Sequence, residues 1–282
     1  MGQDIPGSPS RRLKLHGPLA RRHRARLQGS GEELIVFSHG FGSDQSAWRA
    51  LIDQLPARFT AISYDLPGAG PLLPDHFDPG AYAALNDYAD DLLALLDEIG
   101  VDRCIYVGHS VSGMIGVIAG VAAPARFRQF VLINGSPRYL NDEGYHGGFD
   151  RDDLNGLFGA MATNYEAWVA GFAPMVVGAD VPRAVDTFSA GLLAMRPDVT
   201  LHVARTIFES DYRDLLPQLT VPTLLVHSRG DVAVPRAVAD YLRSHIRHSD
   251  LVWIEADGHL PHLTVPRQLY ETIRDRIAPS ET

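Results

Sequence analysis

The sequence predicts an α/β fold in which helices cover both faces of a mostly parallel, doubly wound sheet. Three observations carry this prediction: short apolar runs recur along the chain, amphipathic segments separate them, and one connection is far too long for a loop. The runs are apolar almost throughout, which is typical of strands that are buried on both faces and therefore of parallel sheets. Regular alternation of strand and helix favours a doubly wound architecture.

The composition is that of a globular chain. Of the 282 residues, 45% are apolar and 21% are charged, which excludes disorder for the bulk of the chain. The length suits one large domain or two small ones. No apolar stretch reaches the roughly 18 residues that a membrane-spanning helix needs. The longest stretch, 111–123, is therefore interpreted as a buried helix.

Six apolar runs are the expected strands, and five amphipathic segments are the expected helices. The clearest helix covers 80–99, where leucines on one side oppose acidic residues on the other and Gly100 follows the last turn. Residues 20–28 are expected to add an antiparallel hairpin at the sheet edge. The other expected helices are 46–55, 111–123, 236–247 and 264–277, and the expected strands are 34–38, 59–64, 103–107, 130–134, 222–228 and 250–255.

One connection interrupts this alternation. Between Asn134 and Pro222 lie 87 residues with helical patterns, many aromatic side chains and no convincing strand. Structureless loops of that length are rare in compact domains, so we expect a helical insertion. Because it follows the carboxyl end of a strand, where α/β proteins bind ligands, it is expected to form a lid. The predicted organisation is a flexible N-terminal extension over 1–18, a core over 19–136 and 212–282, and a helical lid over 137–211.

The charged residues exclude several kinds of function. Lys14 is the only lysine among 25 basic residues, which argues against Schiff-base chemistry, a pyridoxal phosphate anchor and a Walker-A loop. Residues 1–26 contain seven basic side chains and one acidic side chain, whereas the remainder contains 18 basic and 33 acidic residues. This acidic body argues against nucleic acid or an anionic membrane as a partner.

The single cysteine, Cys104, rules out an internal disulfide and a multi-cysteine zinc site. It lies in an apolar run and is interpreted as a core residue. We expect no metal and no cofactor. The N-terminus lacks an apolar core followed by a small-residue cleavage site, which favours a cytoplasmic protein over a secreted one. Sparse serine and two early prolines disfavour an organellar leader.

The strongest chemical signal is the segment GHSVSG at 108–113, which follows an expected strand and opens an expected helix. A serine at such a turn is held exposed at a helix N-terminus, where backbone amides stabilise an oxyanion. The pattern departs from Gly-x-Ser-x-Gly because Ser112 occupies the fifth position. Taken alone, Ser110 has an alternative interpretation as a helix N-cap.

Two further residues reduce the weight of that alternative. Asp231 follows the strand that ends in VHSRGD, and His259 follows the last strand in WIEADGHLPH. Serine, acid and histidine then occur in the chain order of α/β-hydrolase triads, each just past the carboxyl end of a strand. In such triads the histidine activates the serine hydroxyl and the acid orients the imidazole. Asp257 and His262 are the nearest rivals and fit supporting roles better.

The second oxyanion element is expected in the turn SHGFG at 38–42, after the first buried strand. We predict the backbone amides of Phe41 and Val111 as the pair of donors. A dinucleotide-binding interpretation of this turn lacks its third glycine, because Gln45 occupies that position, and it has only Asp65 as a loose ribose partner.

On these motifs the chain resembles the α/β-hydrolase branch that contains the plant strigolactone and karrikin receptors and the bacterial stress-response hydrolase RsbQ. The resemblance covers roughly residues 24–280, and a serine at position 112 is normal in this branch. It implies a Ser110–His259–Asp231 triad, an oxyanion hole at Phe41 and Val111, and an apolar cavity under four lid helices. The motifs that carry it are SHGFGSDQSAW (38–48), PDHFD (74–78), GHSVSGMIG (108–116), SPRYLNDEGYHGGF (136–149), NYEAWVAGFAP (164–174), MRPDVTLHVARTIFESD (195–211) and DGHLPHL (257–263).

The resemblance also implies which side chains line that cavity. For any one of them, packing inside the lid is an equal alternative. The implied substrate-binding residues are His109, Tyr139, Phe149, Trp168, Phe172, Ile207 and Phe208.

The sequence therefore predicts a serine hydrolase that acts on a small apolar ester or lactone through an acyl-enzyme. The resemblance implies a lactone of the butenolide, strigolactone-like kind. The alternative is a ligand-gated signalling receptor with slow, incidental hydrolysis that recruits a protein partner at its lid. We expect a monomer whose ligand is a small apolar molecule, with neither nucleic acid nor a membrane as partner.

Overall fold

The computed structural model describes residues 13–70, 77–178 and 180–277, so that part of the motif at 74–78 lies outside the described residues. Its sheet has seven strands in the order β1-β3-β2-β4-β5-β6-β7. β1 pairs with β3 in the antiparallel direction, and all other neighbours are parallel. The strands are β1 (Arg26–Gly29), β2 (Glu33–Ser38), β3 (Phe59–Tyr64), β4 (Cys104–His109), β5 (Phe127–Ile133), β6 (Thr223–Gly230) and β7 (Ser249–Asp257).

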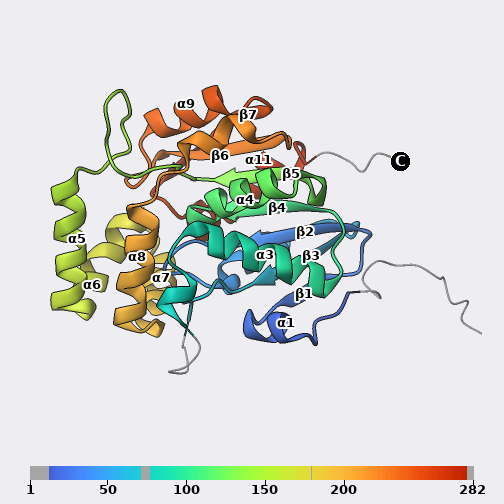
Figure 1. Cartoon of the computed structure of the whole chain (residues 1–282), viewed down its shortest axis with the longest axis horizontal. Helices are drawn as coiled ribbons and strands as arrows, with labels where there is room; N and C mark the ends of the chain where they lie inside the picture. Colours follow the sequence, from blue (N-terminus) through green and yellow to red (C-terminus); the bar gives the residue numbers. More distant parts are fainter. Residues whose placement is uncertain (1–12, 71–76, 179, 278–282) are drawn as a thin grey trace, which may run out of the picture.

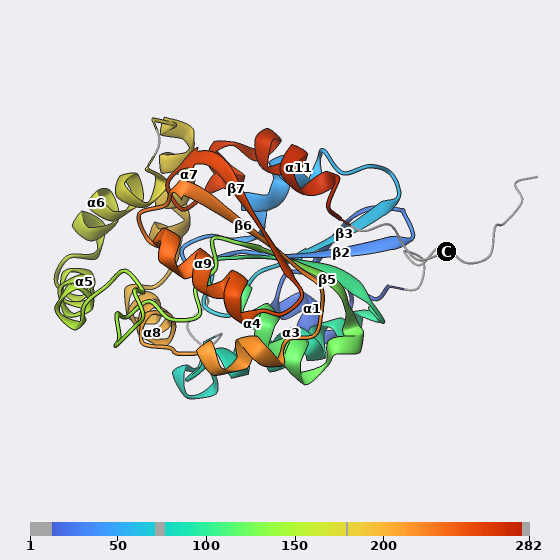
Figure 2. The same cartoon turned by 90° about the horizontal axis from the view of Figure 1, so that it is seen from above.

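Helices cover both faces of this sheet (Figures 1 and 2). One face packs against α1, α3, α4 and α9, and the other against α2 and α11, which produces two hydrophobic cores separated by the strands. Cys104 is buried in the first of these cores. The predicted doubly wound, mostly parallel sheet is therefore confirmed. The helices are α1 (Pro18–Arg22), α2 (Arg49–Ile52), α3 (Leu85–Ile99), α4 (Val111–Ala122), α9 (Arg236–His245), α10 (Pro261–Thr264) and α11 (Pro266–Arg274).

All six predicted strands are present, but four local predictions differ from the structure. The expected helix over 46–55 is a 3-10 turn at Gln45–Trp48 followed by the four-residue α2. The expected helix over 80–99 begins only at Leu85, after a 3-10 turn at Pro79–Ala81. The expected helix over 264–277 is the shorter α11, which begins at Pro266 and follows the separate short helix α10, because Pro266 lacks the N–H that would continue α10. Residues 20–28 form no hairpin: α1 covers their first part, and β1 pairs with β3.

Residues 13–17, the described part of the expected N-terminal extension before α1, contact the sheet domain. The backbone N–H of Lys14 donates to Ile99 O at the end of α3, with an N···O distance of 2.9 Å. Leu13 and Leu15 pack against the first hydrophobic core, so apolar side chains tie residues 13–17 to the sheet domain. Residues 1–12 lie outside the described residues.

The long connection after β5 contains four helices that lie together at one end of the molecule, beside the carboxyl ends of the central strands (Figure 1). α5 packs against α8, and α6 packs against α7. This is the helical insertion predicted as a lid. Its helices are α5 (Arg151–Thr163), α6 (Tyr165–Val177), α7 (Pro182–Ala194) and α8 (Pro197–Phe208). Within the described ranges of the whole chain, no helix is both long and apolar enough to cross a membrane.

Candidate active site

Ser110 lies between the last residue of β4 and the first residue of α4. Its backbone has φ 56° and ψ −121°, a strained conformation that residues with a side chain rarely adopt. The Ser110 N–H donates to Ile133 O on the neighbouring strand β5, at 2.9 Å. This bond holds the tight turn, so that the serine side chain reaches the cavity above the sheet edge.

Ser112 explains why the motif tolerates a serine in place of its second glycine. Its Oγ donates to His39 O at 2.6 Å and shares a 2.8 Å hydrogen bond with Ser38 Oγ. The Tyr106 hydroxyl donates to Ser112 O at 2.9 Å. Ser112 therefore ties the start of α4 to the turn after β2, the two segments that contain the predicted oxyanion donors.

The structure brings Ser110, His259 and Asp231 together. His259 Nε2 lies 2.8 Å from Ser110 Oγ, and His259 Nδ1 lies 2.8 Å from Asp231 Oδ2. Asp231 Oδ1 accepts the backbone N–H groups of Ala233 and Val234 at 2.8 and 3.1 Å, which leaves Oδ2 for the imidazole. In this geometry Nε2 can accept the serine proton while Nδ1–H donates to the carboxylate.

The backbone of His259 is held from three directions. Its carbonyl oxygen accepts from His109 Nε2 at 2.7 Å and from Asn134 Nδ2 at 3.1 Å. Its N–H donates to Val176 O, in lid helix α6, at 2.8 Å. Asn134 was not predicted as a site residue. Its place just past the carboxyl end of β5 was the one available signal, since the other site residues also follow strand ends.

Two buried histidines pack beside the catalytic-site imidazole. The His109 ring lies 4.9 Å from that of His259 and 4.4 Å from that of His262, between centroids, and His262 stacks on Trp48. Burial lowers the pKa of His262 to about 3 and lowers the pKa of His109 well below its ordinary value. Both rings are thus neutral near pH 7 and place no positive charge near the His259 imidazole.

A cavity of about 130 Å³ opens beside Ser110, between the sheet edge and the lid. Among the described residues that line it, only Ser110, Tyr139 and His259 contribute polar side chains, and none is an acid, a lysine or an arginine. The Tyr139 hydroxyl lies 3.2 Å from Ser110 Oγ, and burial raises the pKa of Tyr139, so the phenol stays protonated. The remaining lining residues are Phe41, Phe149, Phe172, Met175, Val176, Phe188, Ile207, Phe208, Val232, Ala233 and Leu260.

Most of the predicted pocket residues are at this cavity, but two lie elsewhere. Trp168 stacks on Phe172 at 4.7 Å between centroids, so it supports a lining residue without lining the cavity itself. His109 packs behind His259 and holds its backbone. The predicted residues that line the cavity are Tyr139, Phe149, Phe172, Ile207 and Phe208.

Several lining residues were not predicted. Phe188 is one of the aromatic residues of the lid. It is buried together with Ala184 and Leu192, and their spacing of four residues along α7 was the available signal that Phe188 faces inward. Val232 and Leu260 directly follow Asp231 and His259, so their positions next to the triad could have identified them. The other unpredicted lining residues are Met175, Val176 and Ala233.

The two predicted oxyanion donors belong to adjacent segments. Phe41 lies in the turn after β2 and lines the cavity, and Val111 is the first residue of α4. Amides in the first turn of a helix have no partner within the helix and are free to bind an anion. Among the described residues, no three His, Cys, Asp or Glu side chains gather as a metal site would require.

The chain is similar to known proteins over nearly its whole length. The profile of the "Alpha/beta hydrolase family" matches residues 35–272. "Strigolactone esterase RMS3" of Pisum sativum is 48% identical over 254 residues, which cover 89% of this chain and 95% of that protein. "Karrikin insensitive 2 receptor CA" of Petunia hybrida is 46% identical and covers 89% and 93%. A solved hydrolase from Oleispira antarctica superimposes with a TM-score of 0.88 at 32% identity and covers 92% and 96%.

Proposed function

This chain belongs to the alpha/beta hydrolase family, and on that premise we propose that it hydrolyses a small, uncharged, largely apolar ester or lactone by a serine mechanism. The observation that carries the proposal is the pair of 2.8 Å contacts that join His259 to Ser110 and to Asp231 at an apolar cavity. The lining favours an uncharged substrate, because a charged group would be desolvated there without a counter-ion.

In the proposed reaction, Ser110 Oγ attacks the ester carbonyl carbon as His259 Nε2 takes the hydroxyl proton. The amides of Phe41 and Val111 donate to the oxyanion that forms on the carbonyl oxygen. His259 then gives its proton to the leaving alcohol oxygen, and the C–O bond breaks to leave an acyl-enzyme. A water molecule, deprotonated by the same imidazole, releases the acid and restores Ser110. Asp231 keeps Nδ1–H in place and stabilises the imidazolium.

The relatives support a lactone of the butenolide kind as substrate. Two curated relatives with strigolactone or karrikin in their names are 48% and 46% identical to this chain across nearly all of it. The cavity of about 130 Å³ suits a compact substrate.

The test is hydrolysis of p-nitrophenyl acetate and of a fluorogenic butenolide by the wild type and by Ser110→Ala. We expect both substrates to be cleaved by the wild type only. Intact mass spectrometry after the butenolide reaction is expected to show a stoichiometric adduct on Ser110 or His259 that is absent from Ser110→Ala. Equal cleavage by both proteins would overturn the mechanism, and cleavage of the acetate alone would exclude butenolides.

A second candidate is a ligand-gated receptor that hydrolyses its ligand slowly and recruits a protein partner at the lid. The observation that favours it is the hydrogen bond from His259 N–H to Val176 O, which joins the reaction centre to lid helix α6. A receptor is expected to turn over far below the roughly 1–1000 per second of ordinary enzymes. It is also expected to change amide-hydrogen exchange in the lid when a butenolide binds. Unchanged exchange would exclude this role. The cytoplasmic location stays a prediction, which cell fractionation would check.

A further inference from the structure

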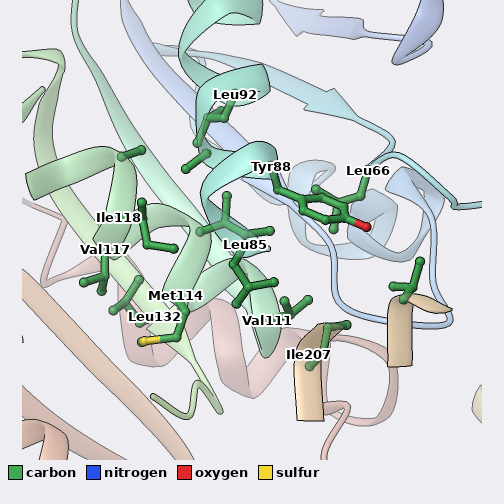
Figure 3. Close-up of a cluster of buried hydrophobic side chains, with 14 of the residues drawn as sticks. Leu66, Leu85, Tyr88, Leu92, Val111, Met114, Val117, Ile118, Leu132 and Ile207 are labelled. Atoms are coloured by element: carbon green, nitrogen blue, oxygen red, sulfur yellow. The ribbon is translucent and has the colours of Figure 1, made fainter. Parts of the chain in front are cut away.

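A second, smaller cavity adjoins the catalytic cavity. Phe41 and Ile207 line both, so their side chains form the wall between the two spaces. The second cavity, which we call the side chamber, has a volume of about 20 Å³, enough for one water-sized group. Figure 3 shows Leu85 and Tyr88 of α3, Val111 of α4 and Ile207 of α8 converging at this place from three helices.

The side chamber touches the place where the carbonyl of a bound ester lies. Phe41 and Val111, the proposed oxyanion donors, both belong to its lining. A substituent on the carbonyl carbon therefore has a short path into the chamber once the Phe41 or Ile207 side chain rotates. Phe41 is half-buried and contacts Phe208 by a ring edge, with centroids 6.4 Å apart.

One buried hydroxyl in this chamber is without a partner. Tyr88 is 4% exposed, and its hydroxyl has no hydrogen-bond partner among the residues that the structure describes. Most buried hydroxyls in folded proteins are bonded, so an orphan of this kind points to a group that is supplied from outside the chain. Burial raises the pKa of Tyr88, which keeps the phenol protonated and able to donate.

Two other polar side chains, His39 and Ser43, line the chamber, and the ring of His39 is already bonded within the fold. His39 Nδ1 donates to Gly40 O at 2.9 Å, and His39 Nε2 accepts the Leu66 N–H at 2.9 Å. Both nitrogens are thus used within the fold. Among the described residues of this mainly apolar lining, Tyr88 is the one whose buried polar atom has no hydrogen-bond partner.

We propose that the side chamber receives one acceptor oxygen, a ketone or an ether, from the far end of the substrate's acyl group, and that this oxygen accepts a hydrogen bond from Tyr88. The inference rests on the proposed hydrolysis at Ser110 and specifies its substrate. The larger catalytic cavity then holds the leaving alcohol. In a lactone, the substituent beside the carbonyl carbon takes the place of the acyl chain.

The test uses two p-nitrophenyl esters with the same chain length, the pentanoate and the 4-oxopentanoate. They differ by one ketone oxygen near the end of the acyl chain. The wild type is expected to have the higher kcat/KM for the 4-oxopentanoate. In Tyr88→Phe this preference is expected to fall by about three- to tenfold, the value of one hydrogen bond, while kcat/KM for the pentanoate hardly changes.

Tyr82→Phe is the matched control. Its ring lies 5.0 Å from that of Tyr88, but its hydroxyl is bonded to Asp91 and it does not line the chamber. The same chemical change there is expected to leave the ratio of the two esters unaltered. An equal fall of the ratio in both variants would overturn the assignment to Tyr88.

Val203→Ile tests the chamber independently of its hydroxyl. Val203 lines the chamber and is absent from the lining of the catalytic cavity, so the added methyl group fills the chamber alone. We expect kcat/KM for the pentanoate to fall several-fold relative to that for the acetate, with melting temperatures recorded to confirm folding. Unchanged ratios in both Tyr88→Phe and Val203→Ile, with the wild type active on all esters, would overturn the chamber but not the hydrolysis. A wild type inactive on every ester would overturn the proposed function first.

Discussion

The sheet core and the lid are buried to different extents. Every residue of β3 and β4 is buried, whereas α5 buries only Leu154, Phe158 and Met161 of its thirteen residues. The core fixes the three groups of the triad at the ends of strands, and the lid supplies most of the aromatic wall of the cavity. Because the lid buries fewer of its side chains, it is the region expected to open locally at the lower free energy. In the proposed function, the sheet core holds the reacting groups and the lid supplies most of the aromatic contacts to the substrate.

The two regions meet through two close backbone contacts at glycines. A Cβ placed on Gly178, the residue after α6, would lie 2.7 Å from Gly258 Cα, and one on Gly191 of α7 would lie 2.4 Å from Gly42 O. The first contact adjoins His259, and the second adjoins Phe41. The lid thus rests on both loops that contain proposed catalytic groups.

The largest effect is expected from a change that removes the chemistry of the core and leaves the lid intact. Ser110→Ala is expected to reduce kcat for p-nitrophenyl acetate by about 10⁴-fold or more, because the triad acts as a unit. Ligand binding, followed by intrinsic tryptophan fluorescence, to which Trp168 of the lid contributes, is expected to persist. The control is Ser210→Ala at the end of the lid, which removes only a hydrogen bond to Ile207 O. Loss of binding together with turnover in Ser110→Ala would show that the two regions are not separable.

Gly178→Ala tests the contact between the regions. The added methyl group collides with Gly258, and the φ of 67° at position 178 disfavours a side chain. We expect a loss of about 1–3 kcal/mol in the free energy of unfolding and a fall in kcat of roughly tenfold, since the His259 loop must move. Urea unfolding and ester kinetics measure the two effects.

Gly171→Ala is the matched control for that change. Gly171 lies inside α6, and a Cβ there would have no neighbour within 4 Å among the described atoms. This substitution is expected to stabilise the protein by about 0.5–1 kcal/mol, because alanine favours the helix. If both glycine variants kept full activity, the lid contact would have no influence on His259.

The contrast between the sheet core and the lid also explains how much could be predicted from the sequence. Ser110, Asp231 and His259 were identifiable because each lies just past a strand whose apolar run is plain in the sequence, and a parallel sheet brings such ends together. The positions of the strands along the chain, the mostly parallel sheet and the presence of a helical insertion followed from equally local patterns.

What the sequence did not disclose depends on contacts between distant segments. Trp168 was expected in the cavity, but the direction of a helical side chain is decided by the neighbouring helix, here through the stack on Phe172. His109 was expected to bind the substrate, yet its Nε2 donates to the carbonyl oxygen of His259, which lies 150 residues later in the chain. Asn134 was missed for the same reason, since its partners Ser228 and His259 belong to other strands and loops.

A third prediction concerns the pH dependence of stability, which a buried histidine of the core is expected to cause. Burial lowers the pKa of His262 in the folded core to about 3, whereas the unfolded chain protonates this residue near pH 6.5. Stability is therefore complete at and above neutral pH and is lost as the pH falls, because only the unfolded state takes up the proton. At about pH 5 the loss from this residue is about 2 kcal/mol.

His262→Phe measures that contribution, because a phenyl ring can keep the stack on Trp48. Urea unfolding at about pH 7.5 and pH 5 is expected to show a difference between the two pH values that is smaller by about 2 kcal/mol than in the wild type. The control is His146→Gln, at an exposed position in the segment before α5, which is expected to leave the pH dependence unchanged. An unchanged difference in His262→Phe would mean that other groups cause the acid sensitivity.

The smallest effect is expected where the two ends of the lid are joined by ion pairs. Asp211, just after α8, accepts from Arg138 and from Arg213, each at 2.7 Å, and Arg213 also pairs with Asp142. These side chains are partly exposed, so water and salt screen the pairs, but their connection into a network makes them worth more than an isolated pair.

Asp211→Asn is expected to lower the free energy of unfolding by about 1 kcal/mol, and about 0.5 M NaCl is expected to remove most of that difference. Glu271→Gln, which breaks the exposed pair with Arg267 in α11, provides the core counterpart and is expected to cost less than about 0.5 kcal/mol. Because Asp211 contacts neither the cavity nor the triad, kcat for p-nitrophenyl acetate is expected to stay within about twofold. A fall of tenfold or more would contradict this, and would show that the ion pairs at the base of the lid set its position over Ser110 and do not merely add stability.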